Sequence, residues 1–155
     1  YFSNQEIAEY NIEDFGYGSD SKYSLLISFD TNKFKDNQYD DFSIAYETKS
    51  KKIVYYAGFV EGFKNLNECL KYRDEQVSKN RKKFILHKKS AAKSTHKSGL
   101  IQEAVRFQSI KTEAKFNCDY YEDEKDKAVD FRFDVLTSEF NEWVVELSET
   151  KSTSN

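Results

Sequence analysis

Apolar and polar residues alternate along several stretches of this chain, and this period of two constrains the fold more than any other feature. The clearest example is "AVDFRFDV", in which Val129, Phe131, Phe133 and Val135 all fall on one side of an extended chain. Alternation of β-branched and aromatic residues with polar ones is typical of strands that bury one face. We therefore expect a sheet with an aromatic-rich buried face.

Three stretches in the first half of the chain alternate in the same way: "KYSLLISFD", "DFSIAYET" and "KKIVYYAGFVEGF". We expect the third to place Ile53, Tyr55, Ala57 and Phe59 on one face. Only a short polar segment separates the second stretch from the third. Short connections favour antiparallel pairing of the strands that they join.

Two stretches in the second half also read as strands: "EAVRFQS" and "AKFNCDYYED". Their apolar residues differ in phase, because Val105 and Phe107 are odd-numbered whereas Phe116 and Cys118 are even-numbered. A bulge or a break near Ser109 would account for the change.

Two longer segments have the spacing of an amphipathic helix. The first begins at Asn65, which forms a capping pattern with Glu68, and Cys69 falls on its inward stripe. The second follows Thr137 or Ser138, either of which can cap it. The inward stripe of the second helix is Phe140, Trp143, Val144 and Leu147.

Together these elements predict an α+β domain, in which an antiparallel sheet of about five strands is backed by helices in the order α-β-β-β-α-β-β-α. The first helix of that order falls in residues 1–10, where Ser3 and Glu6 repeat the capping pattern. Because 155 residues is the length of one domain, we expect a single domain over residues 1–149. The remaining expectations are a loop at residues 13–22, a basic loop region at 76–102 and a disordered tail at 150–155.

Charge is distributed unevenly along the chain. No acidic residue occurs between Gln76 and Gln102, and this span holds eight of the 24 Lys and Arg residues. Because all 27 acidic residues lie outside it, the span has a formal charge of +8 and the rest of the chain −11.

The basic segment, residues 79–97, has three interpretations. It binds an anionic partner such as a nucleic acid or an acidic lipid, it pairs with the chain's own acidic surface, or it is a solvated loop. Nucleic acid is not the expected partner, because the interleaved aromatics and fold signatures of such proteins are missing. The lysines that would contact an anion are Lys82, Lys83, Lys88, Lys89, Lys93 and Lys97.

The two cysteines, Cys69 and Cys118, both fall on predicted inward faces. A helix packed on the sheet could bring them together as a disulfide in an oxidising compartment. The alternative is a pair of reduced, buried thiols. A nucleophilic thiolate is not expected because neither neighbourhood supplies a histidine, and a zinc site is not expected because no paired Cys or His spacing exists.

No motif predicts catalysis, so we expect a chain without catalytic residues, metal or cofactor. His87 and His96 both lie in the lysine-rich segment, where a histidine is usually solvated. Two acidic stretches provide weak candidates for calcium ligands, but the spacing of a calcium-binding loop is missing. These candidates are Asp30, Asn32 and Asp36 in the first stretch, and Asp119, Glu122 and Asp123 in the second.

Five phrases resemble, in this order, a family of small, uncharacterised exported proteins of marine SAR11 (Pelagibacter-like) bacteria: "YFSNQEI", "GFVEGFKNLNECLKYRDE", "HKSG", "FNCDYYED" and "LTSEFNEW". The resemblance covers nearly the whole chain and implies a signal peptide that has been removed, hence a periplasmic or secreted protein. It supports the oxidised state of Cys69 and Cys118. It implies no catalytic residue, since the family has no assigned activity.

These observations favour a non-enzymatic exported domain that binds a ligand or a protein partner. The longest apolar run is about four residues, so no membrane span is expected. Two alternatives remain: a domain that binds an anionic partner through residues 79–97, and a small hydrolase that uses scattered carboxylates.

Overall fold

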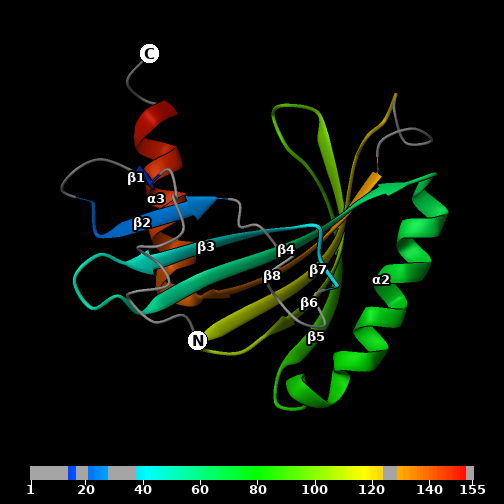
Figure 1. The fold of residues 1–155 in the computed structure, drawn as a ribbon, viewed down its shortest axis with the longest axis horizontal. Helices are drawn as coiled ribbons and strands as arrows, with labels where there is room; N and C mark the ends of the chain where they lie inside the picture. Colours follow the sequence, from blue (N-terminus) through cyan, green and yellow to red (C-terminus); the bar gives the residue numbers. More distant parts are fainter. Residues whose placement is uncertain (1–13, 17–20, 28–37, 124–128, 153–155) are drawn as a thin grey trace.

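A computed structural model describes residues 14–16, 21–27, 38–123 and 129–152 of the chain. Within these ranges, eight strands form one antiparallel sheet and two α-helices pack against it (Figure 1). The α+β class predicted from the sequence is therefore confirmed. The helix expected in residues 1–10 lies outside the described residues.

The sheet consists of two four-stranded meanders that meet at its centre. The strand order is β1-β2-β3-β4-β8-β7-β6-β5, and every neighbouring pair is antiparallel. The strands are β1 Asp14–Gly16, β2 Tyr23–Ile27, β3 Asp41–Glu47, β4 Ile53–Phe63, β5 Lys88–Thr95, β6 Leu100–Gln108, β7 Thr112–Tyr121 and β8 Val129–Thr137. Helix α2 (Leu66–Asn80) and a 3-10 turn, η2 (Arg81–Phe84), connect the two meanders, and helix α3 (Ser138–Ser152) follows the second.

The expectation of about five strands is wrong, because the described residues contain eight: six coincide with the alternating stretches quoted above, and two, β1 and β5, do not. Strand β1 falls in the segment expected to be a loop. Strand β5 falls in the expected basic loop, residues 76–102, which also contains the end of α2, all of η2 and the start of β6. These strands were missed because β1 has only three residues and β5 is largely exposed, so neither shows an alternating apolar pattern.

The phase change near Ser109 marks a tight turn between two strands. The amide of Ser109 donates a hydrogen bond to the carbonyl oxygen of Thr112 at 2.9 Å, and β6 pairs with β7 on either side of this turn. The break predicted there is confirmed.

Strand β4 differs from its prediction at its first residues. Its register against β3 shifts where Tyr46 pairs with Ile53 and Ala45 pairs with Tyr55, so Val54 is an extra residue. As a result Val54 is buried, whereas Ile53 is 41% exposed and does not share the buried environment of Ala57. An insertion of this kind depends on the partner strand, so the alternation along β4 alone could not reveal it.

Helix α2 begins as its sequence predicts. The Asn65 side chain accepts a hydrogen bond from the amide of Glu68 at 3.0 Å, and the Glu68 carboxylate accepts one from the amide of Lys64 at 3.0 Å. The helix lies along one side of the sheet and contacts β7 and β8 (Figure 1).

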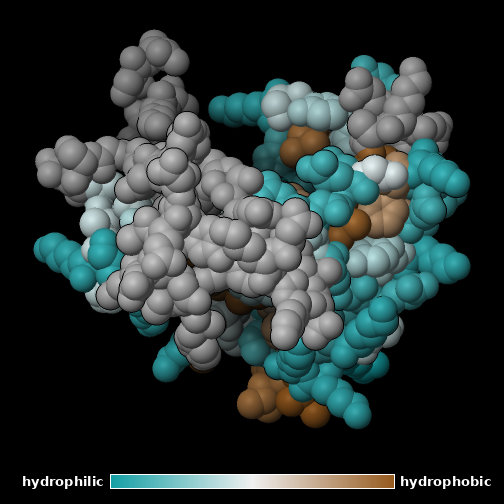
Figure 2. Space-filling view, viewed as in Figure 1, coloured by the Kyte–Doolittle hydropathy of each residue, from teal (hydrophilic) through white to brown (hydrophobic). Residues whose placement is uncertain are grey.

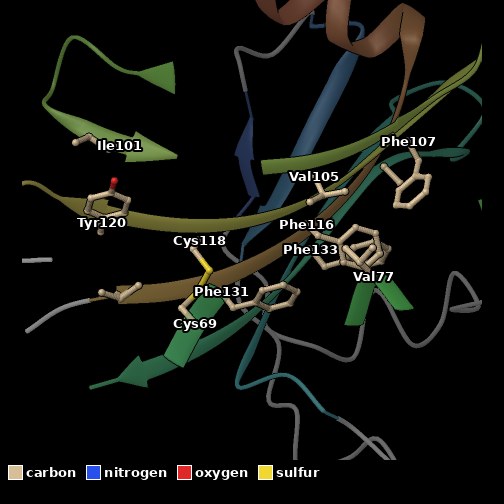
Figure 3. Close-up of a cluster of buried hydrophobic side chains, with 12 residues drawn as sticks. Cys69, Val77, Ile101, Val105, Phe107, Phe116, Cys118, Tyr120, Phe131 and Phe133 are labelled. Carbon is tan, nitrogen blue, oxygen red and sulfur yellow. A yellow bond between two sulfur atoms is a disulfide. The ribbon is translucent and has the colours of Figure 1, made fainter. Parts of the chain in front are cut away.

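The main core lies between α2 and the face of the sheet that carries Phe116, Phe131 and Phe133. The disulfide predicted between Cys69 and Cys118 is present, and it joins α2 to β7 within this core, with 6.0 Å between the two Cα atoms (Figure 3). Both cysteines are 0% exposed. The disulfide therefore fixes the helix to the sheet from inside the core.

Helix α3 packs on the opposite face. Along β8, Phe131 and Phe133 face α2, whereas Leu136, an odd number of residues further on, belongs to a second cluster with Phe140 of α3. The members of this second cluster are Tyr23, Ala45, Val54, Leu136 and Phe140, with Tyr55 and Trp143 packed against them. The helix continues to Ser152 and so includes residues 150–152, which were expected to belong to a disordered tail.

Candidate functional site

The connection between η2 and β5 carries two large apolar side chains into solvent. Ile85 is 82% exposed and Leu86 is 90% exposed. The amide of His87 donates a hydrogen bond to the carbonyl oxygen of Phe84 at 3.0 Å, which closes a four-residue turn with Ile85 and Leu86 at its two corners. The backbone angles of Ile85, φ −60° and ψ −29°, are those of a type I turn.

Residues on both sides of the turn hold it to the sheet. The ring of Phe84 stacks on Phe107, with centroids 5.1 Å apart, and meets Phe116 edge-on at 6.1 Å. Nε2 of His87 lies 3.2 Å from Oγ1 of Thr112, at the start of β7. The turn is thus fixed at both ends, and its two corner residues project from a rigid base.

Such corners are normally Gly, Asn, Asp or Ser, whose backbones and polar side chains suit a solvated turn. Ile85 and Leu86, at these two corners, are almost fully exposed and therefore contribute little to packing within the domain. Figure 2 shows hydrophobic atoms at the foot of the molecule, beside hydrophilic ones, at the end where α2 stops and β5 starts. Because this exposed apolar pair lies on an anchored turn, we treat it as the candidate binding surface of the domain.

Cationic side chains flank this pair on both sides in the sequence. We name residues 81–89 the basic turn. Its five cations, all exposed, are Arg81, Lys82, Lys83, Lys88 and Lys89. Across the described part of the chain, none of the five takes part in an ion pair, so their charges are not neutralised by the protein's own carboxylates.

The structure separates the six lysines predicted to bind an anion. Lys82, Lys83, Lys88 and Lys89 lie in the basic turn. Lys93 instead folds back, and its ammonium group donates to Glu103 at 3.0 Å and to the hydroxyl of Tyr120 at 2.9 Å. Lys97 lies in the β5–β6 turn, at the far end of β5 from Lys88 and Lys89.

Sequence reasoning missed the apolar part of this site. Ile85 and Leu86 stand within a run of basic residues, "RKKFILHKK", and this juxtaposition was the available signal. A second exposed aliphatic residue, Ile110, lies in the β6–β7 turn beside Lys111 and is 95% exposed. This turn is at the same end of the sheet, because Lys88 pairs with Gln108 and His87 contacts Thr112.

A second group of polar side chains lies on the face of β6, β7 and β8 that points away from α2. Its centre is the buried carboxylate of Asp134. This carboxylate accepts hydrogen bonds from the hydroxyl of Tyr55 at 3.1 Å, from the side-chain amide Nδ2 of Asn117 at 2.7 Å and from Nε of Arg132 at 3.0 Å. Nη1 of Arg132 also lies 3.3 Å from the carboxylate of Asp119. Arg132 therefore joins the two carboxylates.

Asp119 continues this network toward the β5–β6 turn. Its carboxylate accepts a hydrogen bond from Gln102 at 3.0 Å, and Gln102 in turn lies 2.8 Å from Nε2 of His96. Burial raises the pKa of Asp119 from 3.8 to about 6; Arg132 opposes this shift and the charge of Asp134 adds to it. Asp119 was a weak candidate for a calcium ligand, and its place in this network gives it protein partners instead.

This network is the part of the structure that the hydrolase alternative would need. A carboxyl with a pKa near 6 can exchange a proton near neutral pH. Asp134, however, has three donors within the protein, and Asp119 is engaged by Gln102 and Arg132. Over the described ranges, no group of three or more His, Cys, Asp or Glu side chains is placed to hold a metal ion. Both carboxylates are therefore bonded to side chains of the sheet itself.

A depression of about 540 Å³ opens beside the start of α3. Its charged lining mixes Glu47, Glu139 and Glu142 with Lys52 and Lys111. Glu139 is also bonded to Lys22. Because the lining has both signs of charge, we assign no ligand to it.

In the described part of the chain, neither helix combines the length and apolarity needed to cross a bilayer. Comparison with protein-family models, curated proteins and solved structures found no match.

Proposed function

We propose that this chain is a non-enzymatic binding domain that docks reversibly on anionic lipid surfaces through the basic turn. The observation that carries the proposal is the exposed pair Ile85 and Leu86, held on an anchored turn and flanked by five cations that form no ion pair within the described residues. In this arrangement the two aliphatic side chains enter the boundary between headgroups and acyl chains. The cations remain at the level of the headgroups.

The energies match a reversible contact. Complete burial of an Ile or Leu side chain contributes about 1.5–3 kcal/mol. Each Lys or Arg close to an anionic leaflet adds about 1 kcal/mol. Ile110 and Lys111 lie at the same end of the sheet and extend the contact. The sum is sufficient for peripheral docking and well below the energy of a spanning helix.

A nucleic-acid partner explains the charge of the basic turn but not its apolar corners. Contacts to phosphates come from cations and polar groups, and bases stack on aromatic rings rather than on Ile or Leu. An acyl-chain boundary is the anionic surface that stabilises both kinds of side chain at once. Binding to an anionic lipid surface therefore accounts for both the cationic and the apolar side chains of the basic turn.

We further propose that the domain acts after export, in the periplasm or outside the cell. The Cys69–Cys118 disulfide supports this, because buried disulfides persist in oxidising compartments and are rare in the cytosol of most organisms. The resemblance to small exported proteins of SAR11-type bacteria points the same way.

The test is sedimentation with vesicles of phosphatidylcholine, with and without phosphatidylglycerol. We expect binding only when phosphatidylglycerol is present, and weaker binding as salt rises. The double variant Ile85→Ser and Leu86→Ser should weaken binding by about 10- to 100-fold, the loss expected for part of the burial energy of two aliphatic side chains. Tyr121→Ser is the matched control, since it changes an exposed residue at the far end of β7.

The Ile85 and Leu86 double variant, together with a charge reversal at Lys82 and Lys83, distinguishes a lipid partner from a nucleic-acid partner. If the partner were a nucleic acid, charge reversal at Lys82 and Lys83 would abolish binding to a DNA duplex, whereas the Ile85 and Leu86 variants would leave it unchanged. Equal vesicle binding by wild type and the Ile85 and Leu86 double variant would contradict the proposal.

A further inference from the structure

Strand β5 is one edge of the sheet, and it is more regular than most edges. All eight of its residues pair with β6 without a register shift, from Lys88 opposite Gln108 to Thr95 opposite Ile101. It contains no proline and no bulge. Natural edges are usually shortened, bulged, interrupted by proline or guarded by charge, because an open edge pairs readily with another strand.

The register shows which backbone groups of β5 are open. The amide of His96 donates to the carbonyl oxygen of Leu100 at 2.8 Å, so this pair is a hydrogen-bonded one. Hydrogen-bonded pairs alternate along an antiparallel ladder. The even-numbered residues of β5 therefore bond to β6, and the odd-numbered ones turn their amide and carbonyl groups outward. These outward residues are Lys89, Ala91, Lys93 and Thr95.

The side chains leave this row of groups accessible. Ala91 is exposed, and its neighbours Ser90 and Ala92 are small. Lys93, the charge that would best guard the middle of the edge, is held over the sheet by Glu103 and Tyr120. These hydrogen bonds raise the pKa of Lys93 above its ordinary value, so its ammonium group stays charged and paired. Among the described residues, the lysines of this edge that form no ion pair are Lys88 and Lys89 at one end and Lys97 just beyond the other.

We infer that β5 accepts an extended, acidic segment of a partner protein as a ninth strand of the sheet. Charge selects this partner, because the span from Gln76 to Gln102 contains no acid and Lys88, Lys89 and Lys97 stand at the two ends of the edge. A second copy of this chain is a poor partner, since pairing two β5 strands would bring together two sets of these lysines. The inference does not depend on the docking of the basic turn on lipid.

The probe is a synthetic peptide as long as β5 in which Glu and Val alternate. Calorimetry with the wild-type protein should show binding, and a peptide with Lys in place of Glu should bind at least about tenfold more weakly. Hydrogen exchange should slow at the amides of Ala91 and Lys93, which face outward in the free protein. The amides of Ala92 and Ser94 already bond to β6 and should change little.

Three experiments isolate backbone pairing. Ala91→Pro removes one outward amide and leaves the ladder to β6 intact, so it should lower affinity at least about tenfold without shifting the urea midpoint. Ala91→Thr keeps the amide and should bind like wild type. The same peptide with an N-methyl group on every residue has no amide donor on either edge, so it tests the wild-type protein directly and should not bind.

Three results would overturn the inference. The first is undiminished binding of the N-methylated peptide, and the second is no binding of the parent peptide. The third is sedimentation showing that the free protein is a dimer and that Ala91→Pro converts it to a monomer.

Discussion

The ring of Phe84 lies almost parallel to that of Phe107, with 5.1 Å between centroids and 23° between planes. The two residues after Phe84 are nearly fully exposed. This aromatic contact is one of those that fix where the chain leaves the core and where the aliphatic corners of the basic turn emerge. Rigid support and exposed apolar side chains are adjacent in the sequence, and the proposed lipid contact depends on both.

Replacing Phe84 should therefore affect both stability and lipid binding. Phe84 is half-buried, so Phe84→Ala should lower the free energy of unfolding by about 2 kcal/mol, below the 3–5 kcal/mol of a fully buried phenylalanine. Vesicle binding should weaken as well, because the turn loses one of its anchors. Urea denaturation and vesicle sedimentation measure the two effects. Phe84→Leu keeps apolar volume at this site and should retain most of both properties.

The disulfide should contribute strongly to stability and be inaccessible in the folded protein. Cys69 and Cys118 are 49 residues apart in the sequence, and closing a loop of that length contributes roughly 4 kcal/mol in the chain-entropy model. The double variant Cys69→Ala and Cys118→Ala should lose about 2–5 kcal/mol in urea denaturation. Because both cysteines are fully buried, a mild reductant should not open the bond in the folded state. Rapid reduction under native conditions would contradict the packing of α2 on β7.

Asp134 should be the most sensitive polar residue of the sheet. Asp134→Ala removes the acceptor of Tyr55, Asn117 and Arg132 together and leaves the Arg132 cation with less compensation. Loss of one partner of a buried charged pair costs about 3–5 kcal/mol, which urea denaturation can measure. Asp130→Asn, on the same face of β8, keeps an oxygen for the amide of Gly62 and should be nearly neutral. Equal effects of the two substitutions would contradict the network.

Asp119 should make the protein less stable as pH rises through the weakly acidic range. Its folded-state pKa of about 6 lies above the ordinary 3.8, so between these values the folded state binds more protons than the unfolded state. The contribution of Asp119 is therefore fully present below pH 3.8 and lost as pH rises through about 6, a change of roughly 2–3 kcal/mol. The variant Asp119→Asn lacks this titration. Urea denaturation at several pH values should show the difference between wild type and variant changing between pH 4 and pH 6, and a constant difference would contradict the shift.

Much of the sheet could be predicted because several strands bury one face. In β8, Val129, Phe131 and Phe133 alternate with polar residues, and the structure buries all three. Asn65 predicted the start of α2 because an N-cap is a local interaction that the sequence displays directly. The pairing of Cys69 with Cys118 followed from the same two periodicities, since each cysteine was in phase with a buried stripe.

Features that depend on distant partners or on exposure could not be predicted in this way. Strand β5 has a largely exposed sequence and is recognisable only from its pairing with β6. The extra residue at Val54 is visible only in the register against β3. The hydrogen bonds of Asp134 join three strands, and spacing along one strand carries no sign of them. The exposure of Ile85 and Leu86 depends on the packing of Phe84 against Phe107. This contact joins residues far apart in the sequence, so no local pattern predicts it.

The central claim, that the corners of the basic turn enter the lipid surface, is tested most directly by fluorescence quenching at position 86. Trp143 is the chain's one tryptophan, so Trp143→Phe provides a silent background in which Leu86→Trp reports on the turn. Lys97→Trp, at the other end of β5, is the matched control. On phosphatidylglycerol vesicles with brominated acyl chains, we expect strong quenching of the tryptophan at 86 and almost none at 97. Sedimentation that shows the protein bound, with the tryptophan at 86 unquenched or both positions quenched equally, would contradict the claim.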